Sequence, residues 1–344
     1  MIYESPDYVK KPLCSVFIFT YNQESLISQT IESILEQQTD FPFEIILAED
    51  FGTDKTKEIC IGFQKKHPEK IKVIAMDENV GMMRNYHENL LNHAKGKYVA
   101  QCAGDDYWCD KLKLQKQVEF LENNLDYGLI HSSLCVLDVD SGSKKEMIKF
   151  DLDEGLKDFF FENKIAALTA CFRLDIFKQY CNEINPLKQN WHSEDYPMWL
   201  YFAGHTKIKV LEEVTAVYRV YADSLSRPKD LNKFLFRIKT RLKFRKFFLN
   251  YYKMDKAFCN DIIYLTYMEA QYWAGKAHDK EYCREIGLFY KANGFLGLSL
   301  FMKVYEYLPF LYPVVSLYER VLVKYNLIKV KKFMNKSYTY NRIK

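Results

Sequence analysis

The first hundred residues alternate between short apolar runs and longer polar segments. The apolar runs cover residues 13–20, 44–48, 71–75 and 98–103. Each run is apolar along most of its length rather than alternating, which is typical of strands buried on both faces of a parallel sheet. The polar residues 1–12 precede the first run and are predicted to be a loose lead-in.

Segments with a helical spacing of apolar residues separate these runs. The first is predicted to begin at Asn22, as its N-cap, and to end near residue 38. The second ends near His67, before Pro68, and the third spans residues 83–94. Three strand–loop–helix units followed by a fourth strand predict a mostly parallel sheet with right-handed crossovers.

A polar loop follows each of the four predicted strands. The loops comprise residues 20–22, 49–54, 79–84 and 105–106. Ligands of open α/β sheets bind beyond the carboxyl ends of the strands, so we expect the four loops to meet at one binding edge. The chain has neither G-x-G-x-x-G after its first strand nor G-x-x-x-x-G-K-[ST], which disfavours a nicotinamide enzyme and a P-loop nucleoside triphosphatase.

Two adjacent carboxylates stand where the fourth strand ends. Gly104 closes this strand, and Asp105 and Asp106 follow at once. Hard carboxylate oxygens at this edge suit Mg²⁺ or Mn²⁺ and the phosphates that bind with these ions. The same three residues also make a good turn, so the pattern alone leaves a metal site and a plain turn both open.

Composition narrows the class of protein. The chain has 344 residues, of which 48% are hydrophobic, so it can form one large domain or two smaller ones. Nine cysteines without a C-x-x-C pair predict a reducing compartment rather than a disulfide framework or a structural zinc site. The N-terminus lacks an apolar signal core, and no uncharged apolar run reaches about 18 residues, so neither secretion nor a spanning helix is expected.

Six segments resemble, in order and spacing, the motifs of one enzyme family. They are TYNQE, EIILAEDFGTDKT, NVGMMRN, KYVAQCAGDDYW, WHSEDYPMWL and VYRVYADSLS. Together, across residues 12–225, they resemble the inverting, nucleotide-sugar-dependent glycosyltransferases of family two. The resemblance implies an α/β fold of the GT-A type, with a Rossmann-like, mostly parallel sheet flanked by helices. It also implies a UDP-sugar donor and a divalent cation, Mg²⁺ or Mn²⁺.

In the glycosyltransferases that this chain resembles, the loops after the first three strands hold the donor nucleotide. Asp50 would accept a hydrogen bond from the uracil N–H. The other residues implied to line the nucleotide are Thr20, Tyr21, Asn22, Glu24 and Arg84. The alternative for Asp50 is a turn or helix-capping acid, and for Arg84 it is a surface arginine on a helix.

Asp105 is the implied direct metal ligand, with Asp106 beside it, and the metal would neutralise the departing diphosphate. Ala103 stands where many relatives carry an acid, two positions before Asp105. The first acid of the metal-binding D-x-D is therefore missing. This departure predicts either weaker metal affinity or compensation by Asp106.

The implied general base is Asp195, with Glu194 as the second candidate. A carboxylate behind the acceptor hydroxyl removes its proton as the oxygen attacks the anomeric carbon. Trp191 would stack on the acceptor sugar or pack as an ordinary core residue. Apolar residues after Pro197 predict a helix that begins near the two acids, so both acids can instead be favoured there by the helix dipole alone.

Arg219 and Tyr221 are the implied contacts of the diphosphate or the acceptor. Arg219 would pair with diphosphate oxygens. Tyr221 stands where relatives often carry a His that binds metal or phosphate, and a neutral Tyr does not replace that His as a metal ligand. The alternative is a core-facing strand that exposes a single arginine.

Helices replace strands in the last third, which predicts a GT-A domain over residues 1–228 and a helical region over residues 229–344. The predicted helices cover residues 231–253, 258–277 and 280–292. The first is basic and amphipathic, and an aromatic segment with flanking lysines follows at 295–333. The pattern leaves three uses of this region open: contact with a membrane surface, packing on the main domain, or a homodimer contact.

The chain is therefore predicted to be a bacterial, inverting hexosyltransferase of surface polysaccharide or lipopolysaccharide synthesis, cytoplasmic or peripheral at the inner face of the cell membrane. It would move a sugar from a UDP-sugar to a saccharide, free or lipid-linked. Loss of the D-x-D acid and of the His leaves a non-catalytic nucleotide- or glycan-binding module as the alternative. A nucleotidyltransferase lacks support because no glycine-rich triphosphate loop is present, and nucleic acid is not an expected partner.

Overall fold

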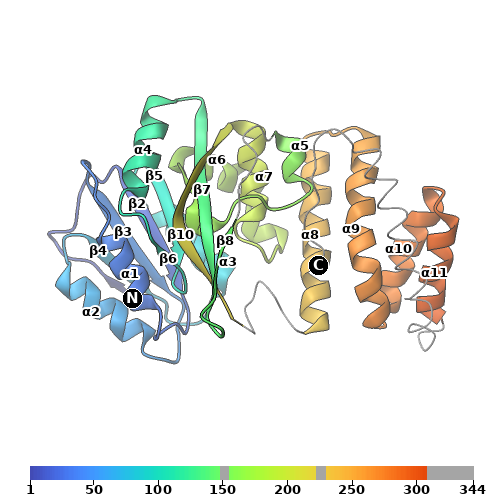
Figure 1. Cartoon of the computed structure of the whole chain (residues 1–344), viewed down its shortest axis with the longest axis horizontal. Helices are drawn as coiled ribbons and strands as arrows, with labels where there is room; N and C mark the ends of the chain where they lie inside the picture. The colour runs from blue at the N-terminus through green and yellow to red at the C-terminus, as the bar shows by residue number, and fades with distance from the viewer. Residues whose placement is uncertain (148–154, 222–229, 308–344) are drawn as a thin grey trace. The chain divides into compact units, whose positions relative to one another are not determined.

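The structure, a computed structural model, describes residues 1–147, 155–221 and 230–307 (Figure 1). The chain divides into two compact units, Met1–Leu225 and Ser226–Lys344. The division falls close to the domain boundary predicted from the sequence. Each unit is described by itself.

The N-terminal unit is built on one ten-stranded sheet with the order β1-β4-β3-β2-β5-β9-β7-β10-β6, and β8 pairs with β7. The strands are β1 (Ile2–Tyr3), β2 (Cys14–Thr20), β3 (Phe43–Glu49), β4 (Ile71–Ala75), β5 (Tyr98–Ala103), β6 (Tyr107–Trp108), β7 (Tyr127–Asp138), β8 (Lys144–Met147), β9 (Cys171–Arg173) and β10 (Lys207–Val220). The four strands predicted from the apolar runs are β2, β3, β4 and β5. They pair in parallel, which confirms the predicted core of an α/β sheet.

Beyond β5 the sheet is mixed. Strand β9 is antiparallel to both β5 and β7, whereas β7 and β10 are parallel. Strand β6, which directly follows Asp106 of the acidic loop after β5, pairs antiparallel with β10 through Trp108 and Ala216. This pairing carries the loop after β5 across to the end of β10, and so joins two motifs that lie more than a hundred residues apart in the sequence.

Helices cover both faces of the sheet (Figure 1). They are α1 (Ile27–Leu35), α2 (Thr56–Lys66), α3 (Met82–His93), α4 (Lys113–Asn123), α5 (Leu156–Phe159), α6 (Leu174–Ile184) and α7 (Tyr196–His205). Val16 and Ile18 of β2 share a core with Ile31 of α1. On the opposite face, the Phe17 ring meets the Tyr86 ring of α3 edge-on, with 5.5 Å between centroids. Burial on both faces is the reason that the strand sequences do not alternate.

The first helix begins later than the sequence predicts. Helix α1 begins at Ile27, without a side-chain cap, and Asn22 lies five residues earlier with a φ of 52°. The prediction of Asn22 as the N-cap was therefore wrong. Asparagine tolerates this left-handed conformation, which turns the chain sharply at the end of β2.

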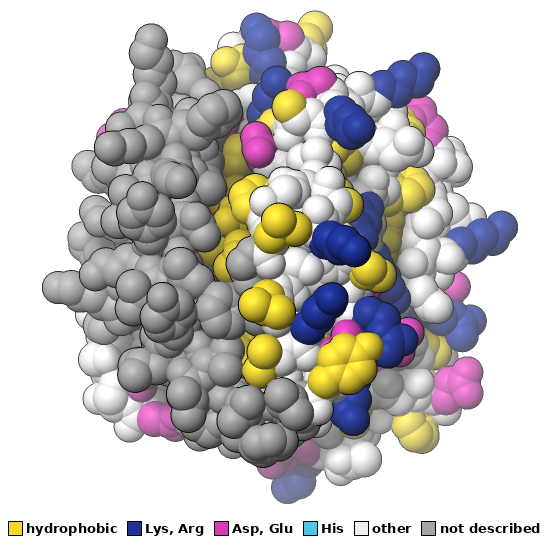
Figure 2. Space-filling view, turned by 90° about the vertical axis from the view of Figure 1, so that its right-hand side faces the viewer, with side chains coloured by type: hydrophobic (Ala, Val, Ile, Leu, Met, Phe, Trp, Pro, Cys, Tyr) yellow, Lys and Arg dark blue, Asp and Glu magenta, His cyan; other side chains and the backbone are white. Residues whose placement is uncertain are grey.

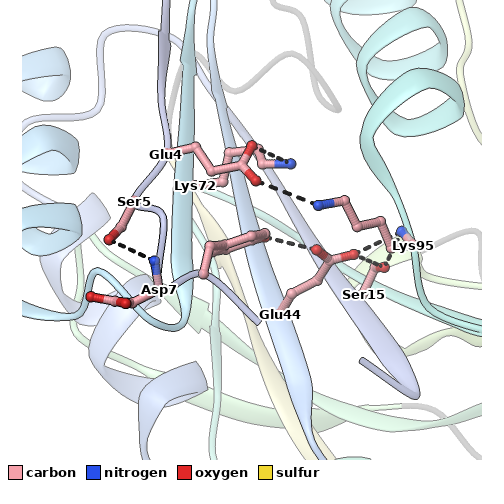
Figure 3. A network of polar contacts seen from close by, with 8 residues as sticks. Glu4, Ser5, Asp7, Ser15, Glu44, Lys72 and Lys95 are labelled. Carbon is pink, nitrogen blue, oxygen red and sulfur yellow. Dashed lines mark hydrogen bonds and ion pairs between the residues drawn. The ribbon is translucent and has the colours of Figure 1, made fainter. Parts of the chain in front are cut away.

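The N-terminal segment is ordered, which corrects the expectation of a loose lead-in. Strand β1 pairs with β4, and Tyr8 is almost fully buried. The Tyr8 hydroxyl donates to Oε2 of the buried Glu44 at 2.8 Å, and Oε1 of Glu44 accepts bonds from the Ser15 hydroxyl and the Lys95 backbone N–H (Figure 3). The ammonium group of Lys72 lies 4.8 Å from the centroid of the Tyr8 ring. This network sits at the amino ends of β2 and β3, away from their carboxyl ends.

We expect Tyr8→Phe to lower the free energy of unfolding by about 1–3 kcal/mol, because it removes a hydrogen bond to the buried Glu44 carboxylate. Catalytic constants should stay unchanged, since the network lies at the opposite edge from the candidate site. Urea denaturation measures the effect. Tyr3→Phe is the matched control, because the Tyr3 hydroxyl bonds to the Met1 sulfur in an exposed setting. Equal losses in the two variants would contradict the assignment.

The C-terminal unit consists of helices α8 (Leu231–Tyr251), α9 (Lys256–Lys276), α10 (Lys280–Ala292) and α11 (Leu296–Tyr307). An aspartate caps each of the first three: the side chains of Asp230, Asp255 and Asp279 accept bonds from the backbone N–H three residues on. The helices share one core, which includes Leu242, Ile286 and Tyr305.

Several basic side chains of α8 bind acids on neighbouring helices. Lys239 pairs with Asp279, and Arg241 pairs with Glu269. Arg245 is buried and donates to the Thr266 hydroxyl at 2.9 Å. Much of the predicted basic face of this helix therefore serves packing within the unit. Among the described residues, no helix has the length and apolar character needed to cross a membrane. Most of the predicted aromatic segment, from residue 308, lies outside the described residues.

Candidate active site

The loops after β2 and β3 are joined by hydrogen bonds between side chains and backbone. Oδ1 of Asn22 accepts a bond from the Thr53 N–H at 2.7 Å, and Oε2 of Glu24 accepts one from the Lys55 N–H at 2.9 Å. The Asp54 carboxylate accepts a bond from the Glu24 N–H at 2.9 Å in return. These contacts fix the first two loops as one unit, with the exposed Tyr21 ring beside them.

Asp50 joins the second loop to the third. Its two carboxylate oxygens accept hydrogen bonds from the N–H groups of Val80 and Gly81, at 2.9 and 3.0 Å. Gly81 has a φ of 79°, a conformation that glycine adopts without strain. Burial raises the pKa of Asp50, and the two N–H bonds lower it. Each oxygen keeps a lone pair for a further donor.

The end of β2 also touches the acidic loop after β5. A Cβ atom on Gly104 would lie 2.6 Å from the Thr20 hydroxyl and 2.4 Å from Oε1 of Gln23. The Thr20 hydroxyl itself donates to that Gln23 oxygen at 2.7 Å. Glycine at position 104 therefore allows the acidic loop to approach Thr20 closely.

The two acids of this loop differ in their surroundings. Asp106 is buried, and its Oδ1 accepts a hydrogen bond from the backbone N–H of Arg219 at 2.8 Å. Asp105 is only partly buried. Burial raises the pKa of both carboxyls; the positive charge of Arg219 opposes the rise in each, and a hydrogen bond with Gln23 also opposes it at Asp105. Asp105 is the more accessible carboxylate of the pair.

The chemistry of the loop fits a divalent cation held partly by its substrate. Within the described residues, no three His, Cys, Asp or Glu side chains are grouped to hold a metal. Mg²⁺ commonly binds through one or two carboxylates together with substrate phosphates and water, rather than in a closed protein cage. Asp105 supplies hard oxygens in a site where burial disfavours an uncompensated negative charge, so a cation there would relieve that cost.

Asp195 is the N-cap of α7. Its Oδ1 accepts bonds from the Tyr196 N–H at 2.6 Å and the Ser193 hydroxyl at 3.2 Å, and its Oδ2 accepts one from the Asn163 side chain at 3.1 Å. The pKa of Asp195 is raised overall, because burial raises it by more than these hydrogen bonds lower it. A held carboxylate with a raised pKa is well suited to accept a proton.

Tyr86 of α3 links this acid pair to the central sheet. Burial, followed by the charges of Glu194 and Asp195, raises the pKa of the Tyr86 hydroxyl, so the two acids lie within electrostatic range of it. The same hydroxyl donates to the Gln101 side chain on β5. The acid pair and the acidic loop are thereby both connected to the carboxyl-terminal half of β5, although no direct contact joins Asp195 to Asp105.

The remaining predicted site residues occupy more varied settings. Arg84 is half-exposed on α3 and forms an ion pair with Glu88 at 3.0 Å. Trp191 is 3% exposed, so neither face of its ring is open in this conformation. Tyr221 is partly buried; burial and the charge of Asp105 raise its pKa to about 12. The rest of its motif, residues 222–226, lies outside the described residues.

Three polar residues that the sequence does not mark contact the acidic loop or Arg219 beside it. Gln23 bonds with Thr20 and with Asp105. Gln29 and Thr30 of α1 contact Arg219 and the backbone of the loop, respectively. Such polar residues give no signal in one sequence, because these partners lie 76 residues or more away along the chain.

Comparison with known families matches the model of glycosyl transferase family 2 to residues 15–178. An uncharacterized glycosyltransferase of Methanocaldococcus jannaschii is 30% identical over 260 residues, which are 74% of this chain and 84% of that protein. The chain belongs to glycosyl transferase family 2.

Other relatives of this family 2 glycosyltransferase match over shorter stretches. An uncharacterized protein of Mycobacterium tuberculosis is 29% identical over 213 residues, so the match spans 61% of this chain and 60% of that protein. The putative teichuronic acid biosynthesis glycosyltransferase TuaG of Bacillus subtilis is 37% identical over 131 residues, 37% of this chain and 50% of that protein.

Solved structures share the fold of this family 2 glycosyltransferase. Staphylococcus aureus TarS (residues 1–349, in complex with UDP) has a TM-score of 0.57 at 17% identity, covering 97% of this chain and 94% of that one. The mannosyltransferase PcManGT of Pyrobaculum calidifontis, in complex with GDP-Man and Mn²⁺, has a TM-score of 0.55 at 15% identity, covering 92% and 89%. These likenesses confirm the predicted GT-A type of α/β fold with a helical C-terminal region.

Proposed function

We propose that this family 2 glycosyltransferase transfers a sugar from a UDP-sugar to a saccharide acceptor with inversion at the anomeric carbon. One observation carries the proposal. The loops after β2, β3, β4 and β5 meet at one edge of the sheet: Asn22 joins the first two, Asp50 joins the loop after β3 to the loop after β4, and Gly104 lets the loop after β5 approach Thr20. This edge presents the Asp105 carboxylate. Edges of this kind hold nucleotide ligands in open α/β sheets.

Two solved relatives support a nucleotide-sugar donor. TarS has been crystallised with UDP and with UDP-GlcNAc, and PcManGT with GDP-Man and Mn²⁺. We favour a uracil nucleotide because the family resemblance implies a UDP-sugar and TarS binds UDP and UDP-GlcNAc; Asp50 can accept the single N–H of the uracil ring. Thr20, Tyr21 and Glu24 would border the base and ribose. Arg84 would break its ion pair with Glu88 and contact the nucleotide instead.

In the proposed reaction Asp195 accepts the proton of the acceptor hydroxyl while that oxygen attacks the anomeric carbon. The bond between this carbon and the diphosphate oxygen breaks, and the nucleoside diphosphate leaves. Glu194 would orient the acceptor beside Asp195. Mg²⁺ or Mn²⁺ bound at Asp105 would supply neutralisation of the diphosphate charge. Tyr221 would face the diphosphate or the acceptor from the end of β10.

The acceptor would be a growing surface polysaccharide, free or linked to a lipid. The Bacillus subtilis relatives TuaG and EpsE, the former named for teichuronic acid biosynthesis, support this class. A peripheral place at the inner face of the cell membrane would suit such an acceptor. Leu288, Leu296, Leu300 and Tyr307 are exposed on α10 and α11. Figure 2 shows apolar side chains among Lys and Arg side chains on the surface that it draws. A homodimer contact through these helices is the alternative use of the same face.

A second candidate function follows from position 103. Ala103 removes one acid from the D-x-D pattern, and Tyr221 occupies the position where relatives often carry a His. A protein that has lost chemistry in this way would bind a nucleotide or glycan without turnover.

Nucleotide discrimination tests the donor site. We expect UDP with Mn²⁺ to raise the melting temperature more than CDP with Mn²⁺, because cytosine presents an acceptor where uracil presents the N–H that Asp50 would take. Equal shifts with UDP, CDP and GDP would contradict the assignment of Asp50 to the base. No shift with any nucleotide would contradict the nucleotide-sugar donor itself.

Asp50→Asn should weaken UDP binding by about tenfold or more and abolish the preference for UDP over CDP, because the substitution removes a charged acceptor. Titration calorimetry measures both affinities. Asp77→Asn is the matched control, since the Asp77 side chain is 84% exposed. A variant that keeps its preference for UDP would show that Asp50 only links the two loops.

A further inference from the structure

The side chain of Arg219 is buried against the loop between β5 and β6. Only 5% of this residue is exposed. Its Nη1 donates to the carbonyl oxygen of Asp105 at 2.6 Å, and its Nη2 donates to the Gln29 side chain of α1. The guanidinium also lies over the Tyr107 ring, 4.5 Å from its centroid. One planar guanidinium group makes all three contacts, and Arg219 lies one residue before the end of β10.

Helix α1 holds the same loop from a second side. The buried Thr30 hydroxyl contacts the carbonyl oxygens of Gly104 and Asp106, at 2.9 and 2.6 Å. The backbone N–H of Trp108 donates to the Ser33 hydroxyl of α1 at 3.1 Å. Residues 104–108, here called the metal loop, are thus clamped between α1 and the end of β10.

These contacts occupy the guanidinium that the family resemblance assigns to the diphosphate. A bidentate arginine–phosphate pair needs two N–H groups directed at the ligand. Here Nη1 and Nη2 are directed at Asp105 and Gln29, and the face of the group covers Tyr107. The geometry therefore fits a group that acts on the loop better than one that acts on the substrate.

We propose that Arg219 is a positioning residue that fixes the metal loop before metal and donor bind. The inference rests on the proposed function, because it concerns how Asp105 is presented to a cation. With alanine at position 103, Asp105 is the principal carboxylate available to the ion, so its backbone must be held without help from a second ligand. A loop that is ordered in advance loses less conformational entropy when the ion binds.

Arg219→Lys tests the proposal, because lysine keeps the charge but cannot reproduce the fork and the stacking. In the metal-free protein, we expect amides of residues 104–108 to exchange hydrogen about tenfold faster in this variant. The affinity for Mn²⁺, measured by electron paramagnetic resonance with UDP present, should fall by about 10- to 100-fold. Gln29→Ala removes one partner of the guanidinium from an exposed helix position, and should give a smaller change of the same kind.

The matched control is Arg173→Lys. Arg173 is also buried, and it donates to the backbone carbonyl oxygens of Leu121, Asn124 and Tyr127 near the amino end of β5. This substitution should perturb exchange in residues 121–127 and leave the metal loop and Mn²⁺ affinity unchanged.

A second measurement separates positioning from direct diphosphate contact. If Arg219 positions the loop, Arg219→Lys should change neither the affinity of the metal-free protein for UDP nor its affinity for uridine. A selective loss of metal-free UDP affinity, with normal exchange in the metal loop, would overturn the proposal in favour of a diphosphate contact. Unchanged exchange and unchanged Mn²⁺ affinity would also overturn it. If the proposed function fails, the wild type binds neither UDP nor Mn²⁺, whereas the exchange comparison in the metal-free protein still reports on the clamp.

Discussion

Asp195→Asn should lower the turnover number by about 10²- to 10⁴-fold while the dissociation constant for UDP stays within about a factor of two. Asparagine cannot accept the proton of the acceptor hydroxyl. It is nevertheless a good N-cap, so the bond from the Tyr196 N–H and the start of α7 are retained. The loss should therefore appear in catalysis rather than in folding or donor binding.

A matched control for this substitution lies on the neighbouring helix. Asp175 near the start of α6 also accepts a bond from the N–H of the next residue, Ile176, but its side chain is exposed. Asp175→Asn should leave turnover unchanged. Glu194→Gln should cost less than Asp195→Asn; the reverse order would assign the base to Glu194. Full activity of Asp195→Asn would remove this residue from the reaction.

The pH dependence of wild-type activity should also report the role of Asp195 as the general base. Burial raises the pKa of Asp195 above the ordinary aspartate range, and only the deprotonated carboxylate accepts a proton. Consequently kcat/KM falls as the pH drops through this raised pKa, and it levels off above it. The acidic limb should be absent from the residual activity of Asp195→Asn.

The second large effect is expected at Asp105. Asp105→Asn should reduce metal-dependent turnover by about 100- to 1,000-fold, because it weakens the charge that holds the cation against the diphosphate. The residual activity should respond little to added Mn²⁺. Activity measured across a Mn²⁺ titration tests both statements.

Two other aspartates of this segment serve as comparisons. Asp110 forms an ion pair with Lys116 at 2.8 Å, outside the metal loop, so Asp110→Asn should keep the Mn²⁺ response. Asp106 accepts the Arg219 N–H in a buried setting, so Asp106→Asn should destabilise the fold as well as the site. A normal Mn²⁺ response in Asp105→Asn would contradict its role as the principal ligand.

The parallel core of the sheet could be predicted because its signal is local. Each strand from β2 to β5 is short and apolar on both faces, and each ends in a polar loop, so the meeting of these loops at one edge of the sheet could be predicted from topology alone. The role of Asn22 was not visible in the same way. Its side chain caps no helix; it bonds to Thr53 in the next loop, and only the folded chain brings these two residues together.

The clamp on the metal loop shows the same limit more strongly. Arg219 contacts Asp105 across 114 residues, and the contact depends on β6 pairing with β10. No local pattern marks that pairing, because β6 is only two residues long. The buried Tyr8 in the polar N-terminal segment was missed for a related reason: its stabilising partner, Glu44, is a charged residue in a strand that otherwise reads as apolar.

The proposed reaction is tested most directly by release of UDP from a panel of UDP-sugars with Mn²⁺, for the wild type, Asp105→Asn and Asp195→Asn. Slow hydrolysis of the donor by water can be measured without the true acceptor. We predict metal-dependent release by the wild type from a restricted set of donors, and loss of release in both variants. Release that persists without metal and in both variants, or no release by a wild type that UDP also fails to stabilise, would contradict the proposed reaction.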